Sequence, residues 1–173
     1  MDVASVTLGE VLRAARARSA ALVPETAAYL ALAIGDASAR LPYRIEDDLV
    51  TLTTEGTVRV ARGKENVAPE EGARVLRDHL HRLLSVSGGS MPGLAAAGSA
   101  RTETGGPETV VAEIESALIP CNRAAARRSL ARLARDTARA RDAGRLAAHA
   151  PAMSARAGVQ AARAKPPVAP AVE

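Results

Sequence analysis

The sequence predicts an α+β fold that is mainly α-helical, with a single β-hairpin at about residues 49–61. Three observations lead to this prediction. Apolar residues recur at helical spacing in five segments, and strand-like alternation occurs only within residues 41–63. From residue 149 to 173 the chain is rich in Ala, Pro and Arg and has almost no large apolar side chain. Such a composition cannot build a packed core, so we expect a disordered C-terminal tail.

The hairpin is predicted from two alternating runs. Val50 and Leu52 alternate with threonines, and Val58 and Val60 flank an arginine. Gly56 lies between the runs and can adopt the positive φ that a short hairpin loop requires. A lone hairpin is marginal in water. We therefore expect helices to cover its apolar face.

The first helix is predicted over residues 8–18. Thr7 and Glu10 have the spacing of a capping box, in which each side chain accepts a hydrogen bond from the other's backbone amide. Val6 and Val11 occupy the positions of a hydrophobic staple. The apolar stripe of this helix predicts that it is amphipathic and lies at the surface.

Two longer helices are each predicted to begin at a proline, a residue that suits the first helical turn. Pro24 opens a helix over residues 24–38, whose centre is apolar on nearly all sides and which we expect to be the most buried helix. Pro69 opens a helix over residues 69–86 that carries leucines at helical spacing.

The remaining chain divides into a linker, two helices and the tail. Residues 87–107 are rich in Gly, Ser and Thr, which predicts a flexible linker. A helix follows from Pro107 or Glu108, and Asn122 can cap a last helix that reaches about residue 147. The predicted organisation is a helical and hairpin core at 1–86, a linker at 87–107, a helical pair on or beside the core at 108–148, and a tail at 149–173.

Charge is distributed unevenly along the chain. The net charge is +4, but residues 1–122 carry 12 basic and 16 acidic side chains, whereas residues 123–165 carry 11 basic and 2 acidic ones. Cys121 is the only cysteine, so no intrachain disulfide can form. The sequence has neither an apolar run of about 20 residues nor the pattern of a signal peptide. We expect a cytoplasmic protein that does not bind a membrane.

Motifs for catalysis and for metal or cofactor binding are missing from the sequence, which has no CxxC, HExxH, GxSxG or P-loop pattern. We therefore predict no catalytic residue, cofactor or metal, and no enzyme. The carboxylates at 46–48 could bind a cation, but a solvated turn is the preferred interpretation. His79 and His81 point in different directions on a helix, so we expect surface or boundary residues. Cys121 has no histidine nearby in sequence to act as its base.

The arginine-rich helix near the C-terminus is the one candidate polyanion-binding element. Its guanidinium groups could bind phosphates. The arginines are spread round the helix, and no aromatic residue lies among them for base stacking. A solvated helix is therefore preferred to a nucleic-acid reader. The candidate residues are Arg123, Arg127, Arg128, Arg132, Arg135 and Arg139.

From residue 6 to 86 the order of elements resembles the C-terminal lobe of bacterial serine/threonine protein kinases. Residues 8–12, LGEVL, resemble the short helix of that lobe, and residues 24–38 its long buried helix. Residues 50–61 resemble the hairpin after the catalytic loop. Ala68-Pro69-Glu70 matches the APE motif and is followed by LRDHLHRLL. The resemblance implies a kinase-like helical lobe.

The chain departs from the kinase pattern at the positions that would carry catalysis. Arg44 falls at the catalytic aspartate and Glu46 at the phosphate-contacting lysine. Leu49 and Arg62 fall at the two metal-binding positions. Phosphoryl transfer depends on these groups, and an arginine cannot accept a proton. If it shares the kinase lobe, this chain is expected to be an inactive, pseudokinase-like form.

The function predicted first is therefore a non-catalytic, kinase-like interaction or regulatory module that binds a protein partner. The alternative is an accessory protein whose arginine-rich helix and tail bind nucleic acid or another polyanion. A small enzyme is the third and least favoured hypothesis.

Overall fold

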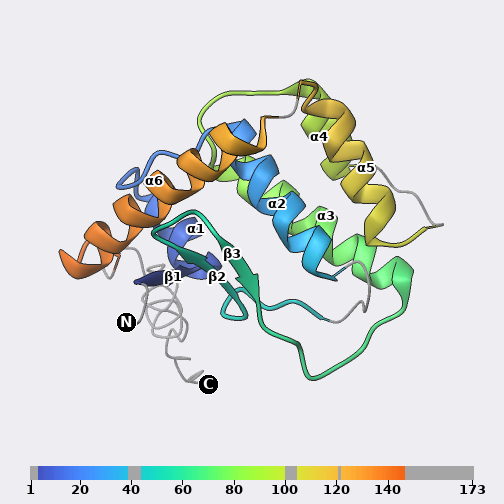
Figure 1. Ribbon diagram of the computed structural model, residues 1–173, viewed down its shortest axis with the longest axis horizontal. Helices are drawn as coiled ribbons and strands as arrows, with labels where there is room; N and C mark the ends of the chain where they lie inside the picture. The colour runs from blue at the N-terminus through green and yellow to red at the C-terminus, as the bar shows by residue number, and fades with distance from the viewer. Residues whose placement is uncertain (1–3, 39–43, 100–104, 121, 147–173) are drawn as a thin grey trace, which may run out of the picture.

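The structure, a computed structural model, describes residues 4–38, 44–99, 105–120 and 122–146. These residues form six helices and one three-stranded sheet, which confirms the predicted α+β class (Figure 1). The elements follow in the order β1 (Ser5–Thr7), α1 (Leu8–Arg16), α2 (Pro24–Ser38), β2 (Val50–Thr53), β3 (Val58–Val60), α3 (Pro69–Val86), α4 (Pro92–Ser99), α5 (Pro107–Ala117) and α6 (Arg123–Asp142).

Helix α2 is central, as predicted from its apolar composition. Ala27, Leu30, Ala31 and Ile34 are at most 1% exposed. Helices α3 and α5 pack on α2 and on each other, and α4 lies against α3 and α5. On the other side of α2, helix α6 crosses α1, α2 and the sheet (Figure 1). Helices α5 and α6 therefore contact different parts of the core, α5 beside α3 and α4 and α6 beside α1 and the sheet.

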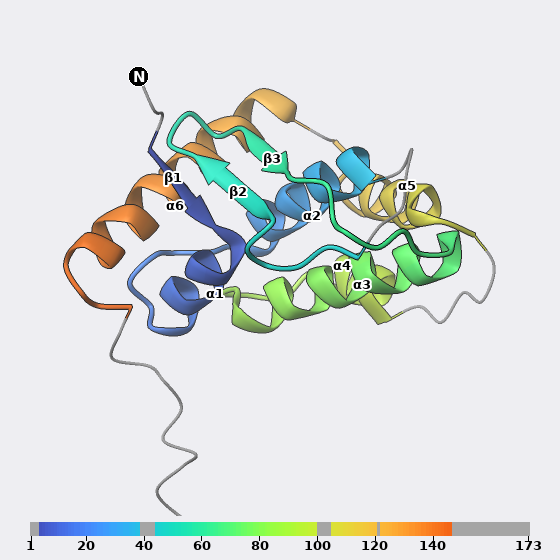
Figure 2. The ribbon, with the colours of Figure 1, turned by 90° about the horizontal axis from the view of Figure 1, so that it is seen from below.

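The sheet is antiparallel, with β2 between β1 and β3. Val6 pairs with Leu52, and Leu52 pairs with Val58, so one apolar row crosses all three strands. Val6, Val50 and Leu52 are each 1% exposed. Seen from below, α6 runs behind the strands and α1 lies beside them (Figure 2).

Strand β1 corrects the prediction of a single hairpin. The sequence analysis assigned Val6 only to a hydrophobic staple, whereas the structure places it in a third strand. A strand of three residues is too short for alternation to be recognised. The capping box directly after β1 is present, because Thr7 N donates to Glu10 Oε2 at 2.8 Å and Glu10 N donates to Thr7 Oγ1 at 3.2 Å.

Helix α4 corrects the prediction that residues 87–107 are a linker throughout. Its Leu94 is fully buried and Ala97 is 6% exposed. The glycines and serines of the segment suggested flexibility, but Pro92 suits a first helical turn and the three alanines at 95–97 have the highest helix propensity. The predicted tail at 149–173 lies outside the described residues.

Candidate functional site

A hydrogen bond joins the N-cap of α6 to α2. Asn122 is the N-cap of α6, and its Oδ1 accepts from Ala125 N at 2.9 Å. The backbone amide of Asn122 donates to Tyr29 Oη on α2, also at 2.9 Å. From this junction α2 and α6 diverge, and the turn between β2 and β3 lies between them (Figure 1).

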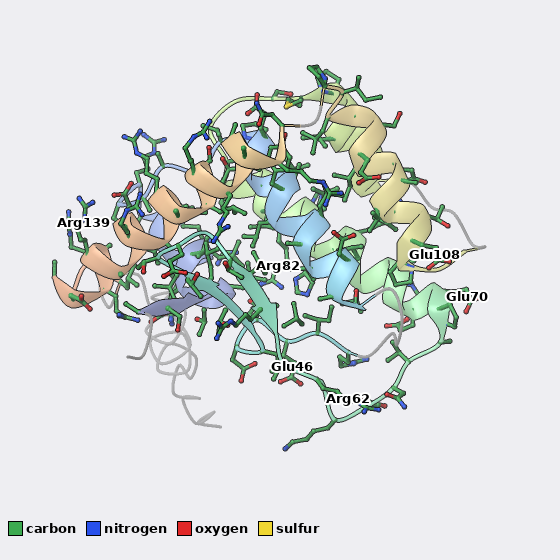
Figure 3. The ribbon with its side chains drawn as sticks, viewed as in Figure 1. Glu46, Arg62, Glu70, Arg82, Glu108 and Arg139 are labelled. Carbon is green, nitrogen blue, oxygen red and sulfur yellow. The ribbon has the colours of Figure 1, made fainter. Side chains whose placement is uncertain are left out.

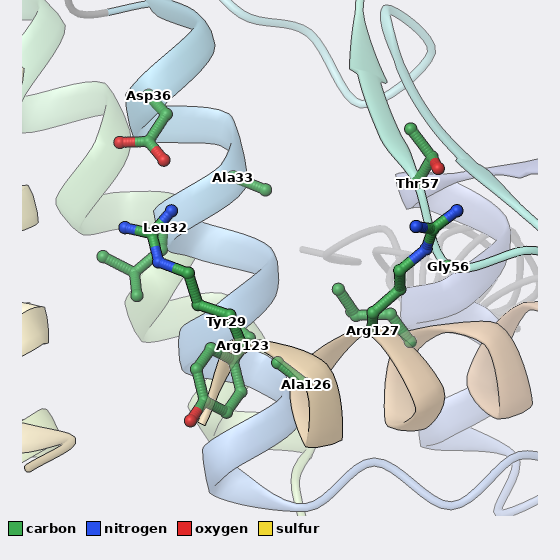
Figure 4. A pocket seen from close by; sticks show the side chains of 10 residues that line it. Tyr29, Leu32, Ala33, Asp36, Gly56, Thr57, Arg123, Ala126 and Arg127 are labelled. Carbon is green, nitrogen blue, oxygen red and sulfur yellow. The ribbon is translucent and has the colours of Figure 1, made fainter. Parts of the chain in front are cut away.

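A groove of about 280 Å³ lies between α2, α6 and this turn (Figure 4). We call it the α6 groove. Its lining combines aliphatic side chains, one tyrosine, one carboxylate and two arginines. The lining residues are Tyr29, Leu32, Ala33, Asp36, Gly56, Thr57, Arg123, Ala126, Arg127 and Leu130.

The turn touches the backbone of α6. Gly56 has φ +81°, and a Cβ at this position would lie 2.1 Å from the carbonyl oxygen of Arg127. Thr53 N donates to Thr57 O at 2.9 Å, and Thr57 N donates to Thr53 Oγ1 at 3.1 Å, which closes the turn. The absence of a side chain at Gly56 therefore permits both the turn and its contact with α6.

Arginines of α6 donate hydrogen bonds to backbone carbonyls of the sheet. Arg127 Nε donates to Glu55 O at 3.2 Å, and an Arg135 terminal nitrogen donates to Thr54 O at 2.8 Å. Arg141 donates to Ser5 O at 3.1 Å and lies 3.7 Å from a carboxylate oxygen of Glu10. These bonds fix α6 against one end of the sheet.

A second set of arginines lies on a single face of α6, which we call the outer arginine face. The residues are spaced four and seven positions apart, so they share one side of the helix. Arg132 and Arg139 are 83% and 73% exposed and lie on either side of Asp136, at 3.8 and 3.4 Å. Arg139 points away from the body of the protein (Figure 3). The members of this face are Arg128, Arg132 and Arg139.

The six candidate arginines fall into three groups. Arg123 and Arg127 line the α6 groove, Arg135 donates to Thr54 O, and Arg128, Arg132 and Arg139 form the outer arginine face. Arg123 also pairs with Glu115 at 3.3 Å and is 78% exposed. The spacing of the outer residues is visible in the sequence, whereas the position of the groove is not.

The positions that the kinase resemblance singles out do not converge on a site. Arg44, Glu46 and Arg62 are exposed, and Glu46 and Arg62 lie along the loops below the sheet (Figure 3). Asp47 accepts hydrogen bonds from both terminal nitrogens of Arg82, one of them at 3.0 Å. Within the described residues, no cluster of three or more His, Cys, Asp or Glu could hold a metal ion. Cys121 lies outside them.

His79 corrects the expectation of a surface or boundary residue. It is 3% exposed, and its Nε2 donates to Ile45 O at 3.2 Å. Its Nδ1 has no hydrogen-bond partner in the described part of the chain and lies 3.8 Å from Asp47 Oδ1. Burial lowers the pKa of His79, and the nearby Asp47 opposes this shift. His81 is exposed, as predicted.

An ion pair that the sequence analysis did not identify joins α3 to α5. Arg77 is 7% exposed and donates two hydrogen bonds to the carboxylate of Glu113, one of them at 3.1 Å. It also donates to Ala97 O of α4. Arg77 follows Ala73 by four residues, so the two lie on the same side of α3. This position beside the apolar stripe was the one signal in the sequence that Arg77 is buried.

Comparison with known proteins found no matching family model, no matching curated protein and no matching solved structure. None of the helices in the described ranges is long and apolar enough to cross a membrane.

Proposed function

We propose that this chain is a non-catalytic interaction module, kinase-like in the order of its elements over residues 6–86, and that it binds a protein partner in the α6 groove. The observation that carries this proposal is the composition of the groove. A tyrosine and two arginines surround an aliphatic floor, and Tyr and Arg are enriched among the residues that dominate protein–protein binding energy.

The size of the groove suits a small part of a partner. Its volume of about 280 Å³ lies at the lower end of the roughly 300–1,000 Å³ of typical small-molecule sites. It can hold one or two side chains of a partner. Its walls come from two helices and a tight turn, elements that position side chains more precisely than long loops do.

The chemistry of the lining supports binding rather than catalysis. No histidine or cysteine is among the lining residues that the structure describes. The two arginines cannot accept a proton. Asp36 is the single carboxylate of the lining and is exposed. By comparison, the cavity between α4 and α5 is walled by small side chains, and its one charged group, Glu113, is already bound to Arg77.

Affinity capture with a matched pair of variants tests the proposal. Ala33→Trp fills the groove, whereas Ala124→Trp places the same side chain on the exposed surface of α6 outside it. We expect a discrete protein to be retained at high salt by the natural chain and by Ala124→Trp but lost with Ala33→Trp. Equal retention by both folded variants would reject the groove as the binding site.

The outer arginine face supports a second candidate function, the binding of nucleic acid or another polyanion. Its residues lie on one side of α6, which is the arrangement that tracking a phosphate backbone requires. Asp136 lies between two of them and reduces the local charge. This function predicts a steep loss of affinity with salt, and a further loss in the double variant Arg132→Gln, Arg139→Gln, measured with a labelled oligonucleotide.

A further inference from the structure

We propose that the occupant of the α6 groove is a peptide segment in which a leucine-like side chain is followed by acidic residues. This inference rests on the proposed function, and it assigns the chemistry of the partner. Three features support it: the aliphatic floor of the groove, the two arginines on its rim, and the position of Asp36.

The floor of the groove fits an aliphatic anchor. Leu32 and Ala33 of α2 face Ala126 and Leu130 of α6 across it. Leu32, Ala126 and Leu130 are each at most 7% exposed, so little of the floor faces solvent. A leucine side chain can enter such a space and remove its apolar surface from water.

The rim of the groove is positively charged where α6 begins. The first turn of α6 has no acidic residue, although acidic side chains are favoured there. Arg127 uses Nε for Glu55 O, and no described residue partners its two terminal nitrogens. Within the described ranges, the one ion pair of Arg123 is with Glu115, at 3.3 Å and largely in water. A carboxylate of the partner could bind either guanidinium through two parallel hydrogen bonds.

Asp36 makes the distribution of charge along the groove uneven. It lies on α2, across the groove from Arg127, which lies beside the hairpin turn (Figure 4). An acidic residue near Asp36 would be repelled, whereas one near Arg127 would be attracted. We therefore expect the acidic residues of the peptide to bind Arg127 beside the turn and Arg123 at the start of α6, and to avoid Asp36.

Charge argues against the chain's own C-terminal segment as the occupant. Residues 147–173 carry Arg156, Arg163 and Lys165, and Glu173 is their only carboxylate side chain. A second copy of this chain would instead offer Ile119, which is 77% exposed, as its anchor. Self-association that Ile119→Ser abolishes would therefore overturn the peptide proposal.

Fluorescence polarisation with synthetic peptides tests the proposal on the full chain. The probe is labelled Gly-Leu-Leu-Glu-Asp-Glu. Its controls are Gly-Ser-Ser-Glu-Asp-Glu, which lacks the anchor, and Gly-Leu-Leu-Lys-Lys-Lys, which reverses the charge. We expect the probe to bind the chain and neither control peptide to bind. Arg123→Glu should weaken it by about tenfold or more, as the loss and reversal of a close charge pair does.

The matched control for Arg123→Glu is Arg132→Glu, since the two arginines are 78% and 83% exposed. We expect Arg132→Glu to change probe affinity by less than about twofold, because it lies outside the groove. Equal effects of the two variants would overturn the proposal, as would equal binding of the serine peptide. Preferential binding of an oligonucleotide that Arg132→Glu abolishes would instead favour the outer arginine face.

Failure of the inference and failure of the proposed function can be told apart. If the probe does not bind but Ala33→Trp still abolishes protein capture, the groove is the binding site and the acidic peptide is the wrong partner chemistry. If the probe binds and Ala33→Trp leaves its affinity unchanged while Ala124→Trp lowers it, both the groove and its occupant are wrong.

Discussion

The two sides of helix α2 are built in different ways. Toward α3 and α5, α2 packs closely around Gly35. Toward α6, the same helix leaves the α6 groove open. Both sides have apolar contacts, since α6 buries Leu133, Ala134 and Ala140 in the core. The α3 and α5 side adds a buried ion pair, whereas the α6 side adds hydrogen bonds from arginines to backbone carbonyls. The comparison teaches that a helix can be fixed by part of its apolar face and by polar bonds while a groove beside it stays open.

The α3 and α5 side is close-packed at Gly35. A Cβ there would lie 2.5 Å from Val111 Cγ2 and 2.9 Å from Leu76 Cδ2. Next to this contact, Arg77 and Glu113 connect α3 to α5. Interiors of this density have no room for an extra methyl group without movement.

Besides its buried apolar face, α6 is held at three points. These are the bond from Asn122 to Tyr29, the contact of Gly56 with Arg127, and the arginine bonds to carbonyls of the sheet. Between these points lies the groove. The two sides should therefore respond differently to substitution.

The largest effect is expected from Glu113→Ala, which leaves the buried guanidinium of Arg77 without its carboxylate. Removing one partner of a buried ion pair costs about 3–5 kcal/mol, and because Glu113 is 32% exposed we expect about 3 kcal/mol. Urea unfolding followed by circular dichroism measures the loss.

The control for this prediction is Glu115→Ala on the same helix. Glu115 is 44% exposed and its partner Arg123 is 78% exposed, so the change should be below about 1 kcal/mol. A loss at Glu113 as small as that at Glu115 would contradict the view that the Arg77 pair holds α3 and α5 together.

Gly35→Ala should have the next largest effect. The added methyl group would force α2 away from Val111 and Leu76, and overpacking of this kind costs about 1–3 kcal/mol. Gly9→Ala is the control, because its nearest neighbour would be Asp47 Cβ at 3.6 Å. Gly9→Ala should be neutral or stabilising by up to about 1 kcal/mol. Equal shifts in the unfolding midpoints of the two variants would contradict close packing at Gly35.

Gly56→Ala tests the α6 side. A Cβ at Gly56 would collide with Arg127 O, so α6 should move off the turn and the amides of α6 should exchange with deuterium faster. Gly144→Ala shares the positive φ, at +68°, but its Cβ would meet no atom within 4 Å. It should show only the left-handed strain of about 1–2 kcal/mol. Unchanged exchange of α6 in Gly56→Ala would show that the turn does not hold α6.

The smallest effect concerns pH. The pKa of buried His79 is lower in the folded state than its ordinary value of 6.5, so the unfolded chain binds the proton more readily. Stability from this residue is therefore complete above about pH 6.5 and falls as the pH drops below it, by at most about 1.4 kcal/mol per pH unit. His79→Gln should flatten the dependence between pH 7.5 and 5.5. His81→Gln, at an exposed position, should leave it unchanged.

Strong local signals in the sequence predicted much of the fold. The bounds of α2 and α3 follow from a proline at the first turn and from sustained periodicity. The capping box of Thr7 and Glu10 fixes the start of α1. Strand β1 and helix α4 were missed because three residues are too few to show alternation and because glycines and serines surround the helical run.

The candidate site could be predicted only in part. Its arginines were recognised from composition, and the spacing of the outer three on one face was available in the sequence. The α6 groove was not predictable, because it is assembled from residues 29–36, 56–57 and 123–130, which no local pattern connects. The Arg77–Glu113 pair spans 36 residues and is hidden for the same reason.

The most direct test of the groove is a titration of the ¹⁵N-labelled full chain with the Gly-Leu-Leu-Glu-Asp-Glu peptide, followed by amide chemical shifts. We expect the largest shifts at residues 29–36, 56–57 and 123–130, which line the two helices and the turn. Shifts confined to amides that follow the outer arginine face, or spread evenly over the surface, would contradict a binding site between α2 and α6.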